Sequence, residues 1–172
     1  MYLRELTEGD VPAWFERASD PESAVLAGDP IPESVEMGFH WLQRHRERFR
    51  QQAGIRWAIV PKGSTDSVGT IGLAITSKEG RSAELGIVIA RASWGRGIGT
   101  SAAHLVTGYA FSTLGLAEIQ AEVLHRNLAS RRLLEKVGFH LLRTIPGDPQ
   151  SLADFEDCFL YVLPNQHRTS AE

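Results

Sequence analysis

Three glycines at alternate positions, Gly95, Gly97 and Gly99, lead into a segment with a helical pattern that begins near Thr100. Because glycine has no Cβ atom, consecutive backbone N–H groups of such a loop can close around an anion. A helix that starts directly after the loop points its free N–H groups and the positive end of its dipole at the same place. Arg96 adds a cation. The pattern predicts a phosphate-binding loop, and a tight strand-to-helix connection without a ligand is the simpler alternative.

The residues around these glycines limit which phosphate compound could bind. An ATP-binding P-loop requires Lys after its last glycine, and no Lys follows here, so that class is excluded. Residues 97–102 fit the pattern G-x-G-x-x-A, and Glu122 follows about 20 residues later, as in dinucleotide-binding proteins. A nicotinamide-dependent oxidoreductase is therefore one alternative. The context differs, however, because a dinucleotide motif opens a series of alternating strands and helices, whereas this loop follows three strands joined by short turns.

One carboxylate, Glu84, lies within the apolar segment Ala83–Ile89. A charge in such a segment is costly unless it faces water or a ligand. Glu84 is therefore a candidate for a functional carboxylate, and the alternative is a strand residue that points to solvent.

Two polar residues, Asn127 and Ser130, stand at the predicted start of a short helix. Asn is a favoured N-cap residue and Ser fits the first turn, so both have a structural explanation. Their three-residue spacing also places them on the same side of one helical turn, where they could contact a ligand. Near the end of the chain, Asp157 together with Asp154 and Glu156 predicts an acidic opening for a cationic amine. A surface ion pair is the alternative for Asp157.

The strands and helices that position these residues follow from hydrophobic spacing and turn residues. Strands are predicted over residues 2–6, 55–60, 68–76, 83–90, 117–124, 139–145 and 155–163. Helices are predicted from Thr7 through Ala18, from about Ser34 through Phe49, from about Thr100 to Leu114 and from Asn127 to Gly138. Asp20–Pro21 and residues 29–32 are expected to form a loop. The three strands over residues 55–90 are separated by short turns, so they are expected to pair as antiparallel hairpins.

Two of these helices carry an apolar face. In the second helix it consists of Phe39, Leu42, His45 and Phe49, and in the third of Leu105, Val106, Tyr109, Ala110 and Leu114. The arginines over residues 44–50 are expected to form a solvated face. The predicted fold class is α+β, with a mixed sheet and helices packed on it.

Composition narrows the function classes. The 172 residues are 42% hydrophobic, which is enough for one domain, predicted over residues 1–164 with a polar tail over 165–172. The net charge of −3 excludes nucleic-acid binding driven by overall charge. The single cysteine, Cys158, excludes a disulfide framework, and the 6 scattered histidines give no support for a metal site. No apolar run approaches about 18 residues and no signal peptide is evident, so a cytoplasmic protein without membrane contact is expected.

Several segments together resemble the GNAT superfamily of acetyl-CoA-dependent N-acetyltransferases. Within it they are most similar to the branch that contains the bacterial acetyltransferases of ribosomal-protein N-termini. The segments are Ala83–Ile89, Trp94–Ala102, Tyr109–Leu116, Asn127–Ser130, Leu134–Phe139 and Asp157–Tyr161. The resemblance is specific over residues 83–163 and loose over residues 1–82. The superfamily motif has Gln or Arg where this chain has Trp94, and Trp is usual there in the branch.

The resemblance implies a GNAT-type fold, a single mostly antiparallel sheet in which strands 83–90 and 117–124 form a parallel, splayed central pair. Acetyl-CoA is the implied co-substrate, with its pantetheine arm between these strands and no metal ion. The implied acceptor is a primary amine, either a protein N-terminus or a small molecule. The implied cofactor-binding residues are Ile87, Val88, Ile89, Trp94, Gly95, Arg96, Gly97, Ile98, Gly99, Thr100, Asn127 and Ser130. A monomer or a homodimer is expected.

The resemblance also implies individual roles. Amides over residues 96–100 hold the pyrophosphate, and an amide near Val88 polarises the thioester carbonyl group. Glu84 is the implied base, Ser130 the implied general acid near the sulfur, and Asp157 a contact of the acceptor. No Cys or Ser stands beside a His in the motif region, so direct attack by the amine is expected, without an acyl-enzyme. A GNAT-fold module that binds acyl-CoA without turnover is the alternative from another functional class.

Overall fold

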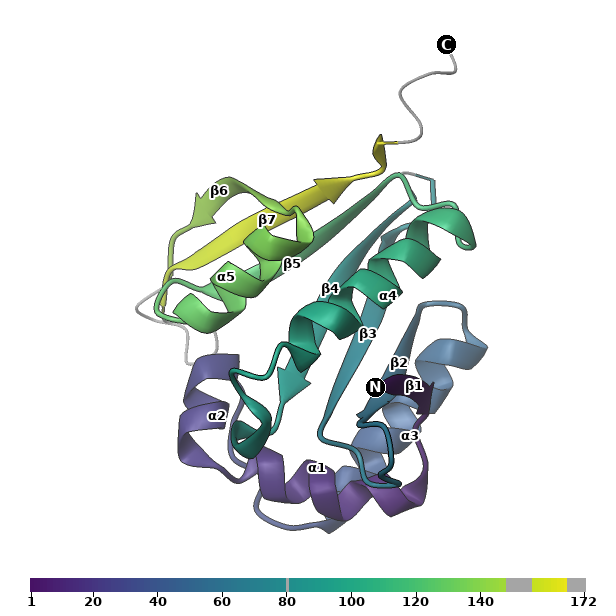
Figure 1. The fold of residues 1–172 in the computed structure, drawn as a ribbon, viewed down its shortest axis with the longest axis vertical. Coiled ribbons are helices and arrows are strands. Elements are labelled where there is room, and N and C mark those ends of the chain that lie inside the picture. The colour runs from purple at the N-terminus through teal and green to yellow at the C-terminus, as the bar shows by residue number, and fades with distance from the viewer. Residues whose placement is uncertain (80, 148–155, 167–172) are drawn as a thin grey trace.

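The computed structural model describes residues 1–79, 81–147 and 156–166, which form a seven-stranded sheet with helices on both faces (Figure 1). The strands are β1 (Tyr2–Glu5), β2 (Gly54–Val60), β3 (Gly69–Ser77), β4 (Ser82–Ile89), β5 (Glu118–Leu124), β6 (His140–Ile145) and β7 (Cys158–Pro164). The helices are α1 (Val11–Ala18), α2 (Pro21–Ala27), α3 (Glu36–Arg50), α4 (Ile98–Ser112) and α5 (Leu128–Val137). The strands lie in the order β1-β2-β3-β4-β5-β7-β6, which confirms the predicted mixed sheet. None of the helices in the described part of the chain is long and apolar enough to cross a membrane.

The centre of the sheet is the pair β4–β5, which is parallel, whereas the other strand pairs are antiparallel. The parallel pairing joins Ser82 with Glu118, Ala83 with Ile119 and Glu84 with Gln120. Both strands continue past this point, to Ile89 and Leu124, without further pairing to each other, although β4 stays paired with β3 and β5 with β7. Figure 1 shows them diverging toward α2. The splayed parallel pair expected from the sequence is therefore confirmed.

Two apolar cores lie on opposite faces of the sheet, because neighbouring residues of a strand point to opposite sides. Ile59 belongs to the larger core, which α4 and α5 cover with residues such as Val106 and Leu134. Its neighbour Ala58 belongs to the smaller core, which α1 and α3 cover with Val11 and Leu42. The sheet is thus the middle layer of three.

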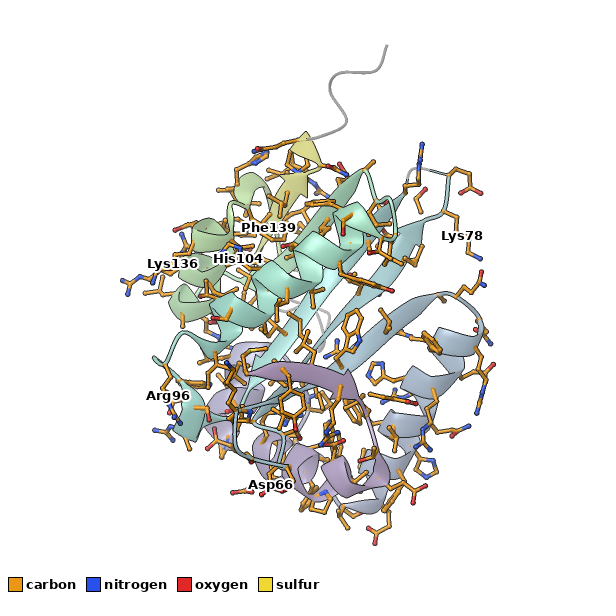
Figure 2. All side chains as sticks on the ribbon, turned by 45° about the vertical axis from the view of Figure 1, so that its right-hand side comes forward. Asp66, Lys78, Arg96, His104, Lys136 and Phe139 are labelled. Carbon is orange, nitrogen blue, oxygen red and sulfur yellow. The ribbon has the colours of Figure 1, made fainter. Side chains whose placement is uncertain are left out.

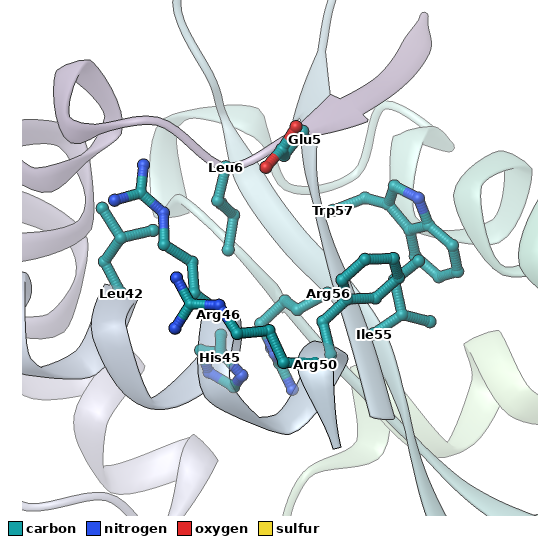
Figure 3. A pocket seen from close by; sticks show the side chains of 10 residues that line it. Glu5, Leu6, Leu42, His45, Arg46, Arg50, Ile55, Arg56 and Trp57 are labelled. Carbon is teal, nitrogen blue, oxygen red and sulfur yellow. The ribbon is translucent and has the colours of Figure 1, made fainter. Parts of the chain in front are cut away.

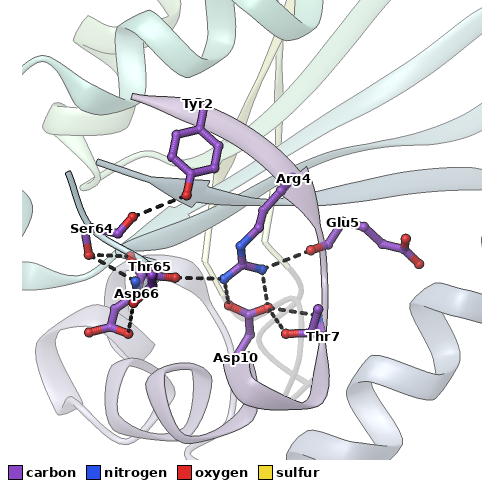
Figure 4. Close-up of polar contacts among 8 residues, drawn as sticks. All are labelled: Tyr2, Arg4, Glu5, Thr7, Asp10, Ser64, Thr65 and Asp66. Carbon is purple, nitrogen blue, oxygen red and sulfur yellow. Dashed lines mark hydrogen bonds and ion pairs between the residues drawn. The ribbon is translucent and has the colours of Figure 1, made fainter. Parts of the chain in front are cut away.

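The connection from β1 to α1 is fixed by a buried ion pair (Figure 4). The guanidinium group of Arg4 donates hydrogen bonds of 2.7 and 2.9 Å to the two carboxylate oxygens of Asp10. The Thr7 N–H donates a third bond, of 2.8 Å, to Asp10, as the predicted capping box requires. Burial raises the pKa of Asp10, but the bonds from Arg4 and Thr7 outweigh it and lower that pKa to about 2.

The segment after Asp20 is a helix, and the prediction of a loop there is wrong. Asp20 accepts a 2.8 Å hydrogen bond from the Ser23 N–H and so caps α2. Pro21 occupies the first helical position, where its missing N–H costs nothing. Gly28 ends the helix with a φ of 72°. Asp-Pro is unfavourable inside a helix but favourable at its start, so the same dipeptide fits a loop and the first turn of a helix.

Part of the predicted apolar faces is exposed. In α3, Phe39 and Phe49 are exposed, and Leu42 is the buried member of the predicted set. In α4 the buried side is built from small residues and Val106, whereas Leu105 and Tyr109 are exposed. Leu114, predicted for the same face, lies beyond the end of α4 and is also exposed. Small side chains bring α4 close to the sheet, and the larger ones then stand at its margins. Tyr109 packs there edge-on against Trp57, with ring centroids 5.8 Å apart.

Asn165, the first residue of the predicted polar tail, is anchored to the fold. Its backbone N–H donates a 2.9 Å hydrogen bond to the Ala117 carbonyl oxygen, and its Nδ2 donates one of 3.0 Å to the Leu116 carbonyl oxygen. The predicted division into a domain over residues 1–164 and a tail over 165–172 stays a prediction. Residues 167–172 of the predicted tail and residue 155 of the predicted last strand lie outside the described residues.

Candidate active site

Trp94 holds the glycine loop between β4 and α4 against the end of β4, because its indole Nε1 donates a 2.7 Å hydrogen bond to the Ile89 carbonyl oxygen. Gly95 and Gly97 have φ values of 72° and 74°, a region that glycine adopts without steric cost. Nothing lies within 4 Å of the position that a Cβ atom would take at either glycine. Because α4 begins at Ile98, the free N–H groups of its first turn border this open space.

Gly99 lacks a side chain for a different reason. A Cβ atom at this position would lie 2.7 Å from Leu133 Cδ1 of α5 and within 3.7 Å of atoms of Ile87 and Ile89. The missing Cβ therefore allows α4 to pack closely against α5 and β4. Gly99 thus has a packing reason that was not predicted from the sequence, and its predicted role in the approach of an anion stays a prediction.

A cavity of about 360 Å³ opens beside the loop, lined by α2, the end of β4, the start of α4 and α5. The predicted cofactor-binding residues that line it are Ile87, Val88, Ile89, Trp94, Gly95, Gly97, Ile98, Gly99, Thr100, Asn127 and Ser130. The one other predicted cofactor-binding residue, Arg96, does not line the cavity. Its exposed side chain lies at the periphery of the molecule in Figure 2. Residues that are far apart in the sequence thus meet around one cavity, and their binding of a cofactor stays a prediction.

The cavity also includes residues that the sequence analysis missed. Ser23, Leu26 and Ala27 line it from α2, the segment predicted to be a loop. Arg132 and Lys136 line it from α5. These two cations are four residues apart and therefore neighbours on the helix surface, close to the N-terminus of α4. Their spacing was the sequence signal that could have identified them, and their chemistry suits phosphate groups.

Asn127 joins two walls of the cavity. Its Oδ1 accepts a 3.0 Å hydrogen bond from the Ser130 N–H and so caps α5, as predicted. Its Nδ2 donates a 2.8 Å bond to the carbonyl oxygen of Leu26 in α2. The adjacent Arg126 donates a 3.0 Å bond to the Val25 carbonyl oxygen of the same helix. The short helix α2 is thereby fixed to the start of α5 and completes the cavity.

Glu84 lies at the last position where β4 pairs with β5, so it stands where the two strands begin to separate. Its side chain reaches solvent. Nearby protein atoms nevertheless remove part of its hydration, which raises its pKa, and Glu122 raises it further. Arg48 and Arg56 act in the opposite direction without cancelling the rise. A carboxylate with a raised pKa at an opening in the sheet is suited to accept a proton.

The acidic residues near the end of the chain make local contacts. The Asp157 carboxylate accepts a 2.8 Å hydrogen bond from the Gly147 N–H. Glu156 forms an ion pair of 2.7 Å with Arg126. Neither residue lines the cavity beside the glycine loop. Asp154, the third member of the predicted acidic opening, lies outside the described residues.

A second cavity, of about 520 Å³, lies between α3, the end of β1 and β2 (Figure 3). Apolar side chains line it together with Arg46, Arg50 and Arg56. His45, also in its wall, is uncharged at neutral pH, because burial and the neighbouring arginines lower its pKa to about 3. This cavity is larger, but none of the site residues predicted from the sequence lines it. The candidate active site is therefore the smaller cavity together with the opening at Glu84.

Comparison with known proteins identifies the family. Residues 1–140 match the acetyltransferase (GNAT) domain family. The chain belongs to the GNAT acetyltransferase family. A relative of this GNAT chain is the uncharacterized N-acetyltransferase YoaA of Bacillus subtilis (strain 168), which is 34% identical over 81% of this chain and 78% of the relative. The enzyme class is therefore acetyltransferase, and the dinucleotide interpretation of residues 97–102 is wrong.

Solved GNAT structures share the fold at lower sequence identity. The spermidine N-acetyltransferase of Vibrio cholerae, crystallised with CoA and spermine, is 19% identical, with a TM-score of 0.80 over 95% of both chains. The ribosomal-protein-S5-alanine acetyltransferase of Vibrio fischeri is also 19% identical, with a TM-score of 0.80 over 95% of this chain and 92% of that one. At these identities the likeness establishes the GNAT fold of this chain and leaves its acceptor open.

Proposed function

We propose that this GNAT acetyltransferase moves an acetyl group from acetyl-CoA to a primary amine, by direct attack of the amine on the thioester. The observation that carries the proposal is the opening between β4 and β5. It begins after Glu84 and Gln120, and the end of β4, Ile87–Ile89, which pairs with β3 but no longer with β5, lines the cavity at the glycine loop. The unpaired N–H and C=O groups of such strands offer hydrogen bonds to an extended arm. A module that binds acyl-CoA without turnover would need the cavity but no base at the opening.

The binding half of the proposal follows from the chemistry of the loop. Backbone N–H groups over residues 97–100 offer donors to a pyrophosphate at the N-terminus of α4. Arg132 and Lys136 add positive charge from the facing helix. Support for acyl-CoA and an amine as partners comes from the spermidine N-acetyltransferase with CoA and spermine, which has the same fold. When bound, acetyl-CoA supplies the activated acyl group.

In the catalytic part of the proposal, each polar group at the candidate active site has one role. Glu84 takes a proton from the ammonium form of the acceptor, and its raised pKa brings it closer to neutral pH, where a general base is most effective. The Val88 N–H donates to the thioester oxygen, on which negative charge develops during attack. Ser130, in the first turn of α5, donates a proton to the leaving sulfur. Asp157 lies outside the cavity and accepts a bond from the Gly147 N–H, so its proposed contact is with a part of the acceptor that extends beyond the opening. The acceptor is a protein N-terminus or a small amine.

The proposal is tested by measuring free thiol released from acetyl-CoA in the presence of N-terminal peptides, polyamines, aminoglycosides and amino acids. We expect at least one class to increase thiol release well above the rate with acetyl-CoA alone. Mass spectrometry of that acceptor should then find one acetyl group on its amine. Tight CoA binding with no amine-dependent thiol release across all classes would reject the transferase in favour of the binding module.

A further inference from the structure

Two guanidinium groups, one buried and one half-buried, lie between the sheet and the helices that cover its smaller core. Arg17, in the last turn of α1, is 5% exposed. Its one hydrogen bond within the described structure is a long contact of 3.5 Å from Nη1 to the Ala13 carbonyl oxygen. Arg56 of β2 is half-buried and donates a 3.2 Å bond from Nη1 to Thr70 Oγ1. Among the described residues, both cations thus have only neutral hydrogen-bond acceptors.

Two glycines, Gly72 and Gly86, allow the Arg56 side chain to extend from β2 across β3 to β4. Arg56 is paired with Gly72 of β3, and Gly72 is paired with Gly86 of β4, so the three residues lie side by side across the sheet on one face. The Arg56 side chain lies flat along this row. Its Nη2 reaches to 2.8 Å from the position that a Cβ atom would take at Gly86. The absence of a side chain at Gly86 therefore leaves the space that the guanidinium group occupies, and the absence of one at Gly72 leaves room for Arg56 Cα and Cβ.

Neither arginine forms an ion pair within the described ranges of the chain. Asp10, which is near Arg17, is held by Arg4. Burial lowers the pKa of Arg17 to about 10 and also lowers that of Arg56, and Arg56 contributes to the shift at Arg17. Both groups still carry a charge at neutral pH. Asp29 and Glu84 act on Arg56 from a distance and raise its pKa without cancelling the effect of burial, and neither forms an ion pair with it in the described ranges. Because desolvated charges without a close partner are expensive, the two adjacent guanidinium groups form a site that a further anion would stabilise.

This cationic site stands directly beside the proposed base. Glu84 precedes Gly86 by two residues, so both face the same side of β4, about 7 Å apart along the strand. Glu84 and Arg56 are near enough for each to shift the pKa of the other. Glu122 of β5 is a second carboxylate near Glu84, and Arg48 of α3 is a further cation near it. The face therefore offers a carboxylate to an amine and guanidinium groups to an anion within the length of one small molecule.

We infer that the acceptor carries a carboxylate as well as its amine, and that Arg56, with Arg17 behind it, binds that carboxylate while Glu84 receives the amine. The inference rests on the proposed acetyl transfer and adds the substrate class. The carboxylate is either that of a free amino acid or an acidic side chain at the N-terminus of a peptide. Arg56 is then a specificity residue and takes no part in proton transfer.

The test compares kcat/KM for matched acceptors: amino acids against their carboxamides, and peptides with Asp against Asn at the second position. We expect the acid to exceed the amide by at least about tenfold in one of the two series, which identifies the source of the carboxylate. Arg56→Met should reduce that preference at least about tenfold, and Arg17→Met should reduce it in the same direction. Gly86→Ala should do so without removing a charge, because its Cβ displaces the guanidinium group. Arg143→Met, an exposed arginine on β6, should leave the preference unchanged.

Equal rates on acids and amides, or a preference that survives Arg56→Met, would overturn the inference while leaving acetyl transfer intact. The amide serves as an internal reference, so a general loss of folding cannot mimic the expected result. If no acceptor causes release of thiol from acetyl-CoA, the proposed function fails, and ligand binding at the anion site is measured by the melting temperature instead. N-acetylated amino acids should then raise the melting temperature of the wild type but not of Arg56→Met. Absence of that rise would reject the anion site as well.

Discussion

Glu84 and Gln120 form the last pair between the two parallel strands, and past them β4 and β5 separate. The carboxylate proposed as the base therefore stands at the point where the sheet opens. A base placed earlier along β4 would face a continuous sheet, and one placed later would lie among the residues that line the cavity, Ile87–Ile89. The proposed base and the residues that line the cavity, Ile87–Ile89, therefore belong to the same strand, β4.

Replacement of Glu84 by Gln keeps the shape of the side chain and removes the base. We expect kcat/KM to fall by roughly 10²-fold or more at neutral pH. The loss should become smaller as pH rises, since more of the acceptor is then already neutral. Glu79→Gln, in the exposed turn between β3 and β4, is the matched control. A loss that is constant across pH would show that Glu84 positions the amine without deprotonating it.

The same variant has a predicted effect on stability. Because the folded protein raises the pKa of Glu84, the ionised carboxylate opposes folding at neutral pH. Glu84→Gln should therefore raise the melting temperature at pH 7. The difference should vanish below about pH 4, where the carboxyl group is protonated in both the folded and the unfolded chain. A variant that melts below the wild type at pH 7 would contradict this electrostatic account of the site.

Asp10 should behave in the opposite way. Its pKa is lowered to about 2, so its ionised form stabilises the folded protein. By linkage that stabilisation amounts to about 2 kcal/mol, is complete above about pH 5 and is lost as pH falls toward about 2. Urea unfolding should therefore show Asp10→Asn less stable than the wild type at pH 7, with the difference shrinking steadily at acidic pH. A difference that does not depend on pH would assign the effect to packing.

The glycine loop allows a controlled test of ligand binding. Gly97→Ala adds a Cβ atom at a φ of 74°, and Gly63→Ala makes the same change at a φ of 82° in an exposed turn, also without atoms within 4 Å. Both substitutions impose similar backbone strain. Calorimetric titration should find CoA affinity reduced at least about tenfold by Gly97→Ala and unchanged by Gly63→Ala. Equal affinities in the two variants would remove the loop from the cofactor site.

The two hydrogen bonds of Asn127, to the Ser130 N–H and to the Leu26 carbonyl oxygen, can be tested separately by substitution. Asn127→Asp keeps the oxygen that caps α5 but places a carboxylate oxygen against the Leu26 carbonyl oxygen. We expect α5 to keep its protection from hydrogen exchange while α2 exchanges faster and CoA affinity falls. Asn127→Ala should loosen both helices, with a loss of about 1 kcal/mol from the cap alone. If α2 is unaffected in Asn127→Asp, this bond does not hold the wall of the cavity.

Features encoded by neighbouring residues could be predicted from the sequence. The capping box of Thr7 and Asp10, the hairpins over residues 55–90 and the loop at Gly95 and Gly97 each depend on a few adjacent positions. Features that depend on register could not be predicted. Arg56, Gly72 and Gly86 are far apart in the chain, and only the pairing of three strands places them in one row. The wall formed by α2 was missed because Asp-Pro fits both a loop and a helix start.

The central claim, amine acetylation by direct attack, is tested most directly with acetyl-CoA labelled in its acetyl group and the best acceptor found. Free thiol and labelled acceptor are followed in the same reaction. The account predicts equal amounts of both at every time point, and no labelled protein after rapid acid quenching. Thiol release without label on the amine, or label retained on the protein during turnover, would contradict it.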